Sequence, residues 1–247
     1  MKFALVGATG FIGSKILAEA VTRDHAITAL CRHPENVAPN ERVRAAYAEV
    51  TDTVSLAREF DGHDAIIHAY APPRDPIVAA LINAAVAAGD HGLKTLSSYV
   101  PKDAIAHDAS VKARIDAQTA ATRSIIQAAK AVKVRRILAV GGAGSLLING
   151  IKCLDLPDFP KAYEGGAKST AVVKELLKEE PDLEWTVLCP STVIEPGERT
   201  GKFRLGLDDL LVAPDGSSKI SVEDYAAAMI DELEAPRHTR HRFTVGY

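Results

Sequence analysis

Short apolar runs recur along this chain, and stretches with apolar residues at helical spacing separate them. The runs predict strands at residues 3–6, 26–30, 43–46, 65–68, 136–140, 185–188 and 243–246. The stretches between them predict helices at residues 14–21, 53–60, 77–88, 113–132 and 169–179. Nearly continuous apolar strands that alternate with helices are typical of a buried parallel sheet with helices on both faces. The pattern therefore predicts a doubly wound, mostly parallel α/β fold in a single domain over residues 1–247.

Two regions depart from a simple alternation. Residues 72–112 lengthen the crossover between the fourth and fifth predicted strands well beyond one helix. Residues 144–168 are predicted to form a long loop at the carboxyl end of the fifth strand, and residues 191–220 form a second one in a small C-terminal extension. Open α/β sheets bind ligands at this end of their strands, so both loops are expected on the substrate side. A later helix is expected to begin with Ser221 as N-cap and Asp224 near the capping-box position, which gives both residues a structural role.

Composition and charge exclude several classes of protein. With 247 residues, 47% of them apolar, the chain can bury a large core, and its net charge of −3 argues against nucleic-acid or membrane-surface partners. The first apolar run breaks at Gly7 and no segment has the length of a membrane-spanning helix, so we expect a cytoplasmic protein. Three widely spaced cysteines (Cys31, Cys153 and Cys189) predict neither a disulfide framework nor a metal site.

A glycine-rich turn connects the first predicted strand to the first predicted helix. Its residues are Gly7, Ala8, Thr9, Gly10, Phe11, Ile12 and Gly13. In this context the first glycine allows a tight turn, the second lets the backbone approach phosphates, and the third lets helix and strand pack closely. Unpaired N–H groups at the helix start face the anion. The turn therefore predicts a dinucleotide-binding Rossmann fold.

The end of the second strand indicates which dinucleotide is bound. An acidic residue there holds the ribose 2′-hydroxyl of NAD, whereas an arginine meets the 2′-phosphate of NADP. This chain has Arg32 at that place and no carboxylate until Glu35. Arg32 would bind the phosphate with two parallel hydrogen bonds and stack on the adenine. We therefore expect NADP(H) to be preferred over NAD(H); the plainer alternative is that Arg32 is a solvated surface arginine.

Several motifs together resemble the atypical short-chain dehydrogenase/reductase superfamily. The matching stretches are residues 7–13, 140–146, 158–160, 195–202, 220–226 and 242–247. Within the superfamily the chain is similar to the NAD(P)H-binding group named for NADH-flavin reductases, which are relatives of the biliverdin IXβ/flavin reductases. The resemblance spans nearly the whole chain except residues 72–112. It implies a sheet of strand order 3-2-1-4-5-6 with an added strand.

The resemblance also implies cofactor contacts after the third to sixth strands. At the adenosine half they are Glu49 and Val50 beside the adenine, and Ala69, Tyr70 and Ala71 beside the ribose and pyrophosphate. At the nicotinamide they are Gly141 and Gly142 on one face of the ring and Pro190, between Cys189 and Ser191, on the other face. Two glycines also suit a tight turn at a strand end, which is an alternative for Gly141 and Gly142. For Cys189 a buried strand-end cysteine is favoured over a reactive thiol.

Carbonyl-reducing members of the superfamily use a Tyr-x-x-x-Lys pair, which one helical turn places on a single face. No tyrosine here has a lysine four residues later. Tyr163 and Lys168 are five apart, which rotates the second side chain by about 140° on a helix, and Gly165–Gly166 argue against a continuous helix between them. No catalytic residue is therefore predicted.

Flavin reduction does not need that pair. Hydride passes directly from nicotinamide C4 to flavin N5, and water supplies the remaining proton. The sequence therefore favours an NAD(P)H-dependent oxidoreductase that reduces a flavin or a similar flat conjugated acceptor, with FMN or FAD as a substrate rather than a tightly bound group.

Two other functions stay open at this stage. The first is a non-catalytic NADP(H)-binding redox sensor, for which residues 72–112 offer a partner surface. The second is a sugar-nucleotide epimerase, which would need the missing tyrosine–lysine pair and ranks last. A small-molecule acceptor is the expected partner, and a homodimer is compatible with the sequence.

Overall fold

The computed structural model of the chain describes residues 1–74, 76, 78–80 and 104–247. The strands in this part are β1 (Lys2–Val6), β2 (Ala26–Cys31), β3 (Val43–Tyr47), β4 (Ala65–His68), β5 (Arg136–Val140), β6 (Leu147–Ile148), β7 (Ile151–Lys152), β8 (Glu184–Pro190), β9 (Val193–Glu195), β10 (Arg204–Gly206), β11 (Lys219–Ser221) and β12 (His241–Gly246). The helices are α1 (Gly13–Thr22), α2 (Thr53–Phe60), α5 (Ala104–Ala131), α6 (Lys161–Lys178) and α7 (Val222–Glu234). Most of the helix predicted at residues 77–88 lies outside the described residues.

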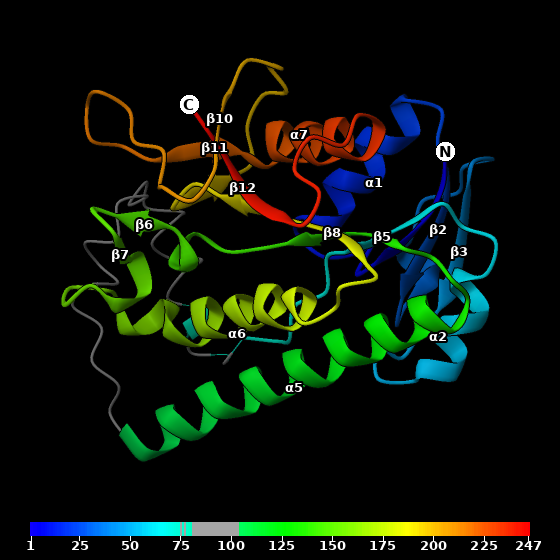
Figure 1. The fold of residues 1–247 in the computed structure, drawn as a ribbon, viewed down its shortest axis with the longest axis horizontal. Helices are drawn as coiled ribbons and strands as arrows, with labels where there is room; N and C mark the ends of the chain where they lie inside the picture. Colours follow the sequence, from blue (N-terminus) through cyan, green and yellow to red (C-terminus); the bar gives the residue numbers. More distant parts are fainter. Residues whose placement is uncertain (75, 77, 81–103) are drawn as a thin grey trace.

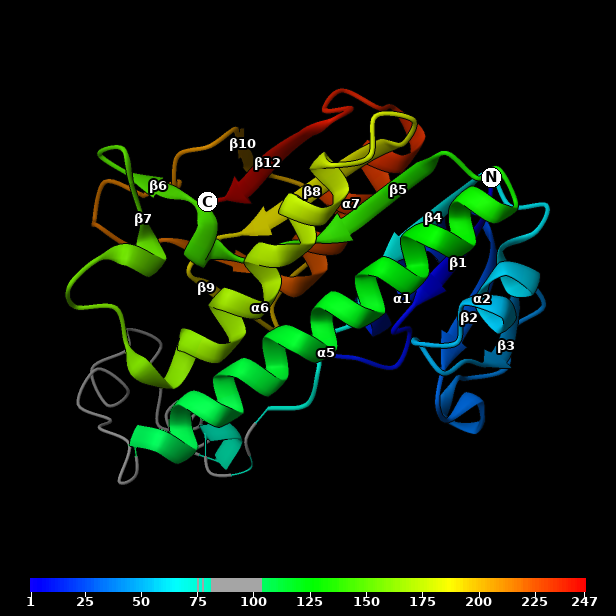
Figure 2. The same ribbon diagram turned by 60° about the horizontal axis from the view of Figure 1, so that its bottom comes forward.

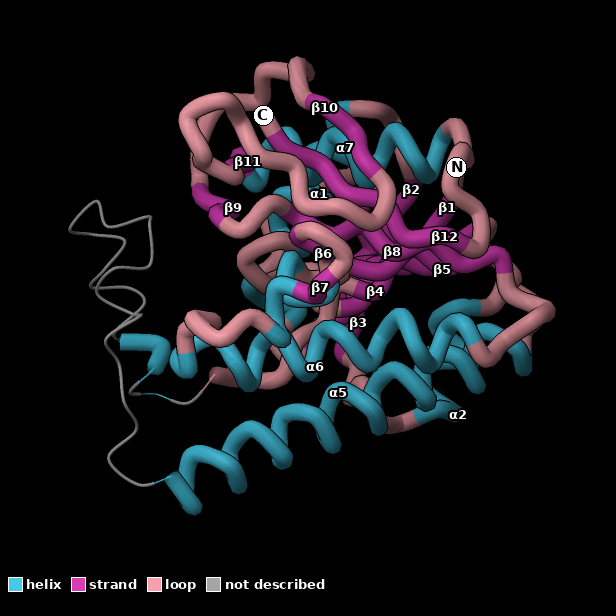
Figure 3. Tube along the Cα trace, turned by 60° about the vertical axis from the view of Figure 1, so that its left-hand side comes forward, coloured by secondary structure: helices cyan, strands magenta, loops and turns pink. Residues whose placement is uncertain are grey.

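A single large sheet forms the centre of the described part of the chain (Figure 1). Its strand order is β10-β12-β8-β5-β4-β1-β2-β3, and every neighbouring pair is parallel except β10 with β12. Helices α1 and α7 cover one face, and α2, α5 and α6 cover the other (Figures 1 and 3). The predicted doubly wound Rossmann fold and its 3-2-1-4-5-6 strand order are confirmed, with β12 and the antiparallel β10 added at one edge.

Both faces of the sheet are buried, which explains why its strands are continuously apolar in sequence. Along β1, Phe3 and Leu5 pack in the cluster under α1 and α7, whereas Ala4 and Val6 pack in the cluster under α2, α5 and α6. Successive side chains of a strand point to opposite faces, so a strand covered on both sides needs apolar residues at every position. The core thus lies in two layers on either side of the sheet.

Helix α6 is longer than the sequence predicts. It begins at Lys161 rather than at residue 169, and Gly165 and Gly166 lie inside it, so the predicted interruption is wrong. A Cβ at Gly165 would lie 3.3 Å from Cδ of Arg114 and 3.5 Å from Cγ2 of Val111, both on α5. Packing against α5, which runs beside α6 in Figure 2, offsets the roughly 1 kcal/mol per residue that glycine costs a helix.

The region predicted as a loop at residues 144–168 is partly regular. Strands β6 and β7 form a hairpin in it, and α6 occupies its end. Asn149 and Gly150 turn the hairpin with φ angles of 51° and 82°. An Asn-Gly pair between apolar residues favours this left-handed turn, and the signal was present in the sequence.

The two expected substrate-side loops are bonded to each other. The Leu147 N–H donates to the Asp208 carbonyl and the Leu210 N–H to the Leu147 carbonyl, each at 2.9 Å. Buried Arg242 on β12 donates to the Asp208 carboxylate and, at 2.5 Å, to the Ser145 carbonyl. Within residues 191–220, β9 and β11 pair in parallel. These contacts hold the loops together beside the carboxyl ends of β5 and β8.

Candidate functional site

The glycines of the first turn are held in a tight backbone arrangement. Gly7 has a φ angle of 88°, and a Cβ there would lie 2.8 Å from backbone atoms of Ala69 and Tyr70 at the exit of β4. A Cβ at Gly13 would lie 2.1 Å from the Gly7 carbonyl oxygen, whereas one at Gly10 would lie 3.3 Å from the same atom. Packing therefore requires glycine at residues 7 and 13 but only weakly at residue 10.

The same turn presents free backbone donors at the start of α1. The Gly10 N–H donates to the Gly7 carbonyl, but within the described part of the chain the N–H groups of Phe11 and Ile12 have no acceptor. Thr9, Gly10 and Phe11 are exposed. Unpaired N–H groups at a helix N-terminus bind anions, and the small Gly10 leaves their approach open. This turn fits the pyrophosphate of a dinucleotide.

Arg32 follows β2 at the same edge of the sheet and is exposed. Glu35, the nearest carboxylate in the sequence, pairs instead with His33 at 3.0 Å. Among the residues with described positions, no carboxylate pairs with Arg32. Its guanidinium is thus available for a phosphate, as the sequence predicts, while Lys15 on α1 is paired with Glu223 at 3.0 Å.

The exits of β2, β3 and β4 come together at Tyr70, which is half-buried. Burial raises the pKa of Tyr70 and the charge of Glu49 raises it further, whereas Arg32 and Arg114 oppose the shift. Glu49 is exposed and Val50 is buried, an arrangement that suits residues at the rim of an adenine site. The structure thus gathers the residues predicted for the adenosine half; their roles toward the cofactor stay predictions. Ala69 and Ala71, on either side of Tyr70, are half-buried and exposed, respectively.

Gly141 and Gly142 follow β5, where the nicotinamide half is predicted. A Cβ at Gly141 would lie 2.6 Å from Sγ of Cys189, and one at Gly142 would lie 2.3 Å from Oγ1 of Thr170 on α6. Close packing against β8 and α6 therefore explains both glycines without a cofactor, which agrees with the structural role that the sequence offered as the alternative. Their contact with a nicotinamide stays a prediction.

The end of β8 forms the other side of this half. Cys189, Pro190 and Ser191 are all buried. Burial raises the pKa of the Cys189 thiol, and the Ser145 hydroxyl lies 3.6 Å from its sulfur. A neutral, enclosed thiol is a weak nucleophile, so the structure favours the packing role for Cys189.

The start of α6 carries charged groups rather than a tyrosine–lysine pair. Lys168 lies 2.5 Å from Glu164, which also contacts Lys161 at 3.1 Å and His107 of α5 at 3.3 Å. Burial would raise the pKa of Glu164, but the hydrogen bonds from Lys168, Lys161 and His107 outweigh it and lower that pKa to about 2. Tyr163 lies on the same continuous helix, yet the five-residue spacing turns it about 140° away from Lys168.

A polar stripe on α5 was missed in the sequence. Gln118 and Thr122 are fully buried and contact His68 at the end of β4, with Thr122 Oγ1 3.1 Å from His68 Nε2. Burial lowers the pKa of His68 to about 4, so the ring is neutral. Arg114 lies one turn before Gln118. The spacing 114, 118 and 122 places polar groups on one helix face, and this spacing was the available signal in the sequence.

The N-terminus of α7 differs from its predicted capping box. Ser221 is the N-cap, as predicted, and accepts the Asp224 N–H at 3.0 Å. The buried Asp224 carboxylate instead accepts bonds from the Thr200 hydroxyl at 2.6 Å and the Gly201 N–H at 2.8 Å, and lies 2.9 Å from the Tyr247 hydroxyl. Asp224 therefore anchors the preceding loop and the last residue, because its carboxylate is occupied by hydrogen bonds from Thr200, Gly201 and Tyr247.

Arg199 ties this loop to the cofactor side of the molecule. It forms two hydrogen bonds of 2.6 Å with buried Glu19 on α1, the helix that opens at the glycine turn. Gly197 N–H donates to Glu223, the partner of Lys15. Residues 195–202, which carry one of the motifs of the resemblance, are thus fixed beside α1.

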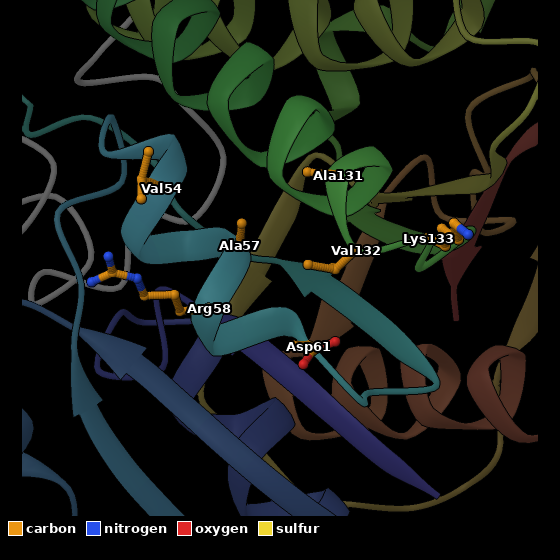
Figure 4. A pocket seen from close by; sticks show the side chains of 7 residues that line it. All are labelled: Val54, Ala57, Arg58, Asp61, Ala131, Val132 and Lys133. Atoms are coloured by element: carbon orange, nitrogen blue, oxygen red, sulfur yellow. The ribbon is translucent and has the colours of Figure 1, made fainter.

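A depression in the surface lies away from these residues, between α2 and the end of α5 (Figure 4). It is lined by Val54, Ala57, Arg58, Asp61, Ala131, Val132 and Lys133. None of the predicted cofactor residues lines it, and α5 ends there at the amino end of β5. It plays no part in the candidate site.

A comparison with protein families identifies the chain. Residues 7–236 match the family described as NAD(P)H-binding. The chain belongs to this NAD(P)H-binding family. The match covers the glycine turn, the exits of the central strands and α7, and so includes all the elements that form the candidate site.

Individual relatives extend over the full length. The chain is 31% identical to YwnB, an uncharacterised protein of Bacillus subtilis, over 99% of this chain and 98% of that one. A Bacteroides thetaiotaomicron structure, provisionally named an epimerase, is 35% identical with a TM-score of 0.78 and covers 100% of this chain and 96% of its own. A Streptococcus pneumoniae structure, provisionally named an NADH-flavin reductase, is 28% identical with a TM-score of 0.67 and covers 100% and 99%.

Two further properties concern the described residues alone. None of their helices is long and apolar enough to cross a membrane. They contain no group of three or more histidine, cysteine or acidic side chains that would hold a metal ion.

Proposed function

We propose that this chain is an NADPH-dependent reductase that delivers hydride to a flavin or a similar flat conjugated acceptor. The observation that carries the proposal is the pairing of a complete dinucleotide turn with an α6 that offers no tyrosine–lysine relay. The Lys168 ammonium is held by Glu164, and Tyr163 lies on another face of the helix. The name of the S. pneumoniae neighbour, an NADH-flavin reductase, agrees with this chemistry.

The chemistry asks little of the protein beyond binding and orientation. A bound reduced nicotinamide supplies two electrons and a proton as hydride to flavin N5, and water supplies the second proton of the reduced flavin. The protein then has to hold two ring systems face to face and exclude water between them. The turn at residues 7–13 and Arg32 would hold the cofactor, and the exits of β5 and β8 would lie beside its reactive end.

Arg32 supports NADPH as the preferred form. It is exposed, follows β2 and has no carboxylate partner among the described residues, and an arginine there suits a 2′-phosphate. The physiological partner under this proposal is a small molecule. We also propose a cytoplasmic location and a homodimer.

The test is the rate of NADPH oxidation by the purified chain with and without FMN, followed at the absorbance of the reduced nicotinamide. Saturable oxidation that depends on FMN supports the reductase. Tight NADPH binding without turnover on FMN, FAD or riboflavin contradicts it and favours the redox sensor. Release of an epimerised sugar nucleotide would favour the activity named for the B. thetaiotaomicron neighbour, although this chain lacks the pair that such chemistry uses.

A further inference from the structure

Two arginines lie near each other at the exit of β4, and neither pairs with a carboxylate of the described residues. Arg114 on α5 is half-buried, and its Nη1 donates at 2.5 Å to the Pro73 carbonyl, next to Arg74. Its Nε is fully buried and has no acceptor among the residues with described positions. Arg74 lies close enough that its charge, together with burial as the larger cause, lowers the pKa of Arg114. No carboxylate pairs with either arginine within residues 1–74, 76, 78–80 and 104–247.

The other enclosed arginines of this protein are all neutralised. Each donates to one or more carboxylates: Arg23 to Glu19, Asp231 and Glu234, Arg136 to Glu232, and Arg242 to Asp208. A buried charge is strongly unfavourable unless it is paired, which explains this pattern. Arg114, with Arg74 near it, differs from this pattern because neither has a carboxylate partner among the residues that the structure describes.

The phosphates of the cofactor already have other candidate partners. Under the proposed function, Arg32 serves the 2′-phosphate and the N–H groups of the glycine turn serve the pyrophosphate, so every phosphate of NADPH already has its partner. Cδ of Arg114 faces Gly165 of α6, and Thr170 of the same helix covers Gly142 at the exit of β5. Arg114 therefore packs against α6, the helix that also covers the exit of β5 where the nicotinamide is expected, and its charge also acts on Tyr70.

We propose that Arg114 and Arg74 bind an anionic group, a phosphate or a carboxylate, of the acceptor. This proposal rests on the proposed function. The acceptor class is then a flat conjugated molecule with an acidic side group, of which FMN is an example and riboflavin is not. Guanidinium groups suit such oxyanions because their N–H donors match pairs of oxygen atoms.

FMN and riboflavin provide the test, since they share the ring system and differ by one phosphate. Initial rates are measured at saturating NADPH for the full chain, Arg74→Met, Arg114→Met and Arg114→Lys, with exposed Arg123→Met on α5 as the matched control. The KM for FMN should rise at least about tenfold in both methionine variants of the pair, with the KM for riboflavin and the control unchanged. Arg114→Lys should restore part of the loss. Arg74 is exposed, so Arg74→Met tests the site even if Arg114→Met fails to fold.

Three results would overturn the proposal. One is an equal rise in KM for FMN and riboflavin, which would assign Arg114 to packing. Another is a rise in KM for both NADPH and NADH, which would assign the pair to the pyrophosphate. If no flavin is reduced, the proposed function fails. Calorimetric titration with FMN and riboflavin then tests separately whether the two arginines bind an anionic group. Tighter FMN binding that Arg74→Met removes supports the anion site, and equal binding of the two flavins refutes it.

Discussion

At the residue scale, two physical reasons for glycine coexist in one short turn. Gly13 is required because a side chain would collide with the Gly7 carbonyl, 2.1 Å away. Gly10 has more space, with 3.3 Å to the same atom, and its small size matters for what approaches from outside. The sequence motif does not distinguish these roles, whereas the distances do.

The first prediction separates the two glycines. Gly13→Ala should lower the free energy of unfolding by about 1–3 kcal/mol or prevent folding, because the backbone has to move to admit the methyl group. Gly10→Ala should keep nearly the full stability but lose most NADPH affinity. Urea unfolding and fluorescence titration measure the two quantities. Full cofactor affinity in folded Gly10→Ala would contradict the role assigned to the turn.

The second prediction concerns Arg32. Arg32→Ala should weaken NADPH binding by about 10- to 100-fold, the value of a charge-assisted phosphate contact, and leave NADH binding nearly unchanged. Exposed Arg58→Ala on α2 is the control for loss of one positive charge. Dissociation constants for both nucleotides should be compared at one ionic strength. Equal losses for NADPH and NADH would refute the 2′-phosphate assignment.

At the scale of elements, tertiary packing overrides local preference. Helix α6 contains two adjacent glycines and still begins at Lys161, because Gly165 lets it approach α5 closely. At α7 the N-cap follows the sequence rule, but the Asp224 carboxylate turns to donors from residues 200 and 201. In both cases a partner distant in the sequence decides the outcome.

The third prediction tests the anchoring by Asp224. Asp224→Ala should cost about 1.5–3 kcal/mol of unfolding free energy, because it removes the fully buried carboxylate that accepts hydrogen bonds from Thr200 and Gly201. The loop at residues 195–202 should become sensitive to trypsin at Arg199 and Lys202. Asp231→Ala on the same helix removes an exposed carboxylate and leaves Arg23 paired with Glu19 and Glu234, so it should cost less than about 1 kcal/mol. Equal losses in the two variants would argue against the anchor.

The fourth prediction is a pH dependence at the start of α6. The pKa of Glu164 is lower in the folded chain, about 2, than its ordinary value of 4.5. A depressed carboxyl pKa gives stability that is complete above pH 4.5 and is lost as the pH falls through about 2. Glu164→Gln should therefore be less stable than the parent at pH 6, with the difference shrinking between pH 4.5 and 2. Melting temperatures at several pH values, with exposed Glu175→Gln as control, measure this.

At the scale of the whole molecule, the strand order brings the site together. Strand β1 lies between β2 and β4, so the chain leaves it toward one side of the sheet and returns on the other. The exits of parallel strands then meet at one edge, where open α/β sheets bind ligands. The added strands β12 and β10 extend the sheet, and Arg242 on β12 holds the loops beside the exits of β5 and β8.

The fifth prediction follows from binding across this edge. A ligand that binds only the folded chain stabilises it by about 2.7 kcal/mol at one hundred times its dissociation constant. For a chain of this length that corresponds to a rise of roughly 5–10 °C in melting temperature. At equal concentration NADPH should raise the melting temperature more than NADH, and Arg32→Ala should abolish the difference. A shift that is equal for both nucleotides in the parent chain would contradict the preference.

The expected strand order came from the resemblance to a known family. The sequence by itself determined the strands, the helices between them, the glycine turn and the place of Arg32. These follow from short-range rules: apolar runs set the strands, helical spacing sets the helices, and the turn needs small residues at fixed offsets. Only the tertiary structure decided that Gly141 and Gly142 are required by packing, that α6 is continuous, and that Asp224 anchors a loop. It also decided that Arg74 lies near Arg114 and that neither pairs with a carboxylate in the described part of the chain. Each of these depends on contacts between residues far apart in the chain, and local patterns carry no information about such contacts.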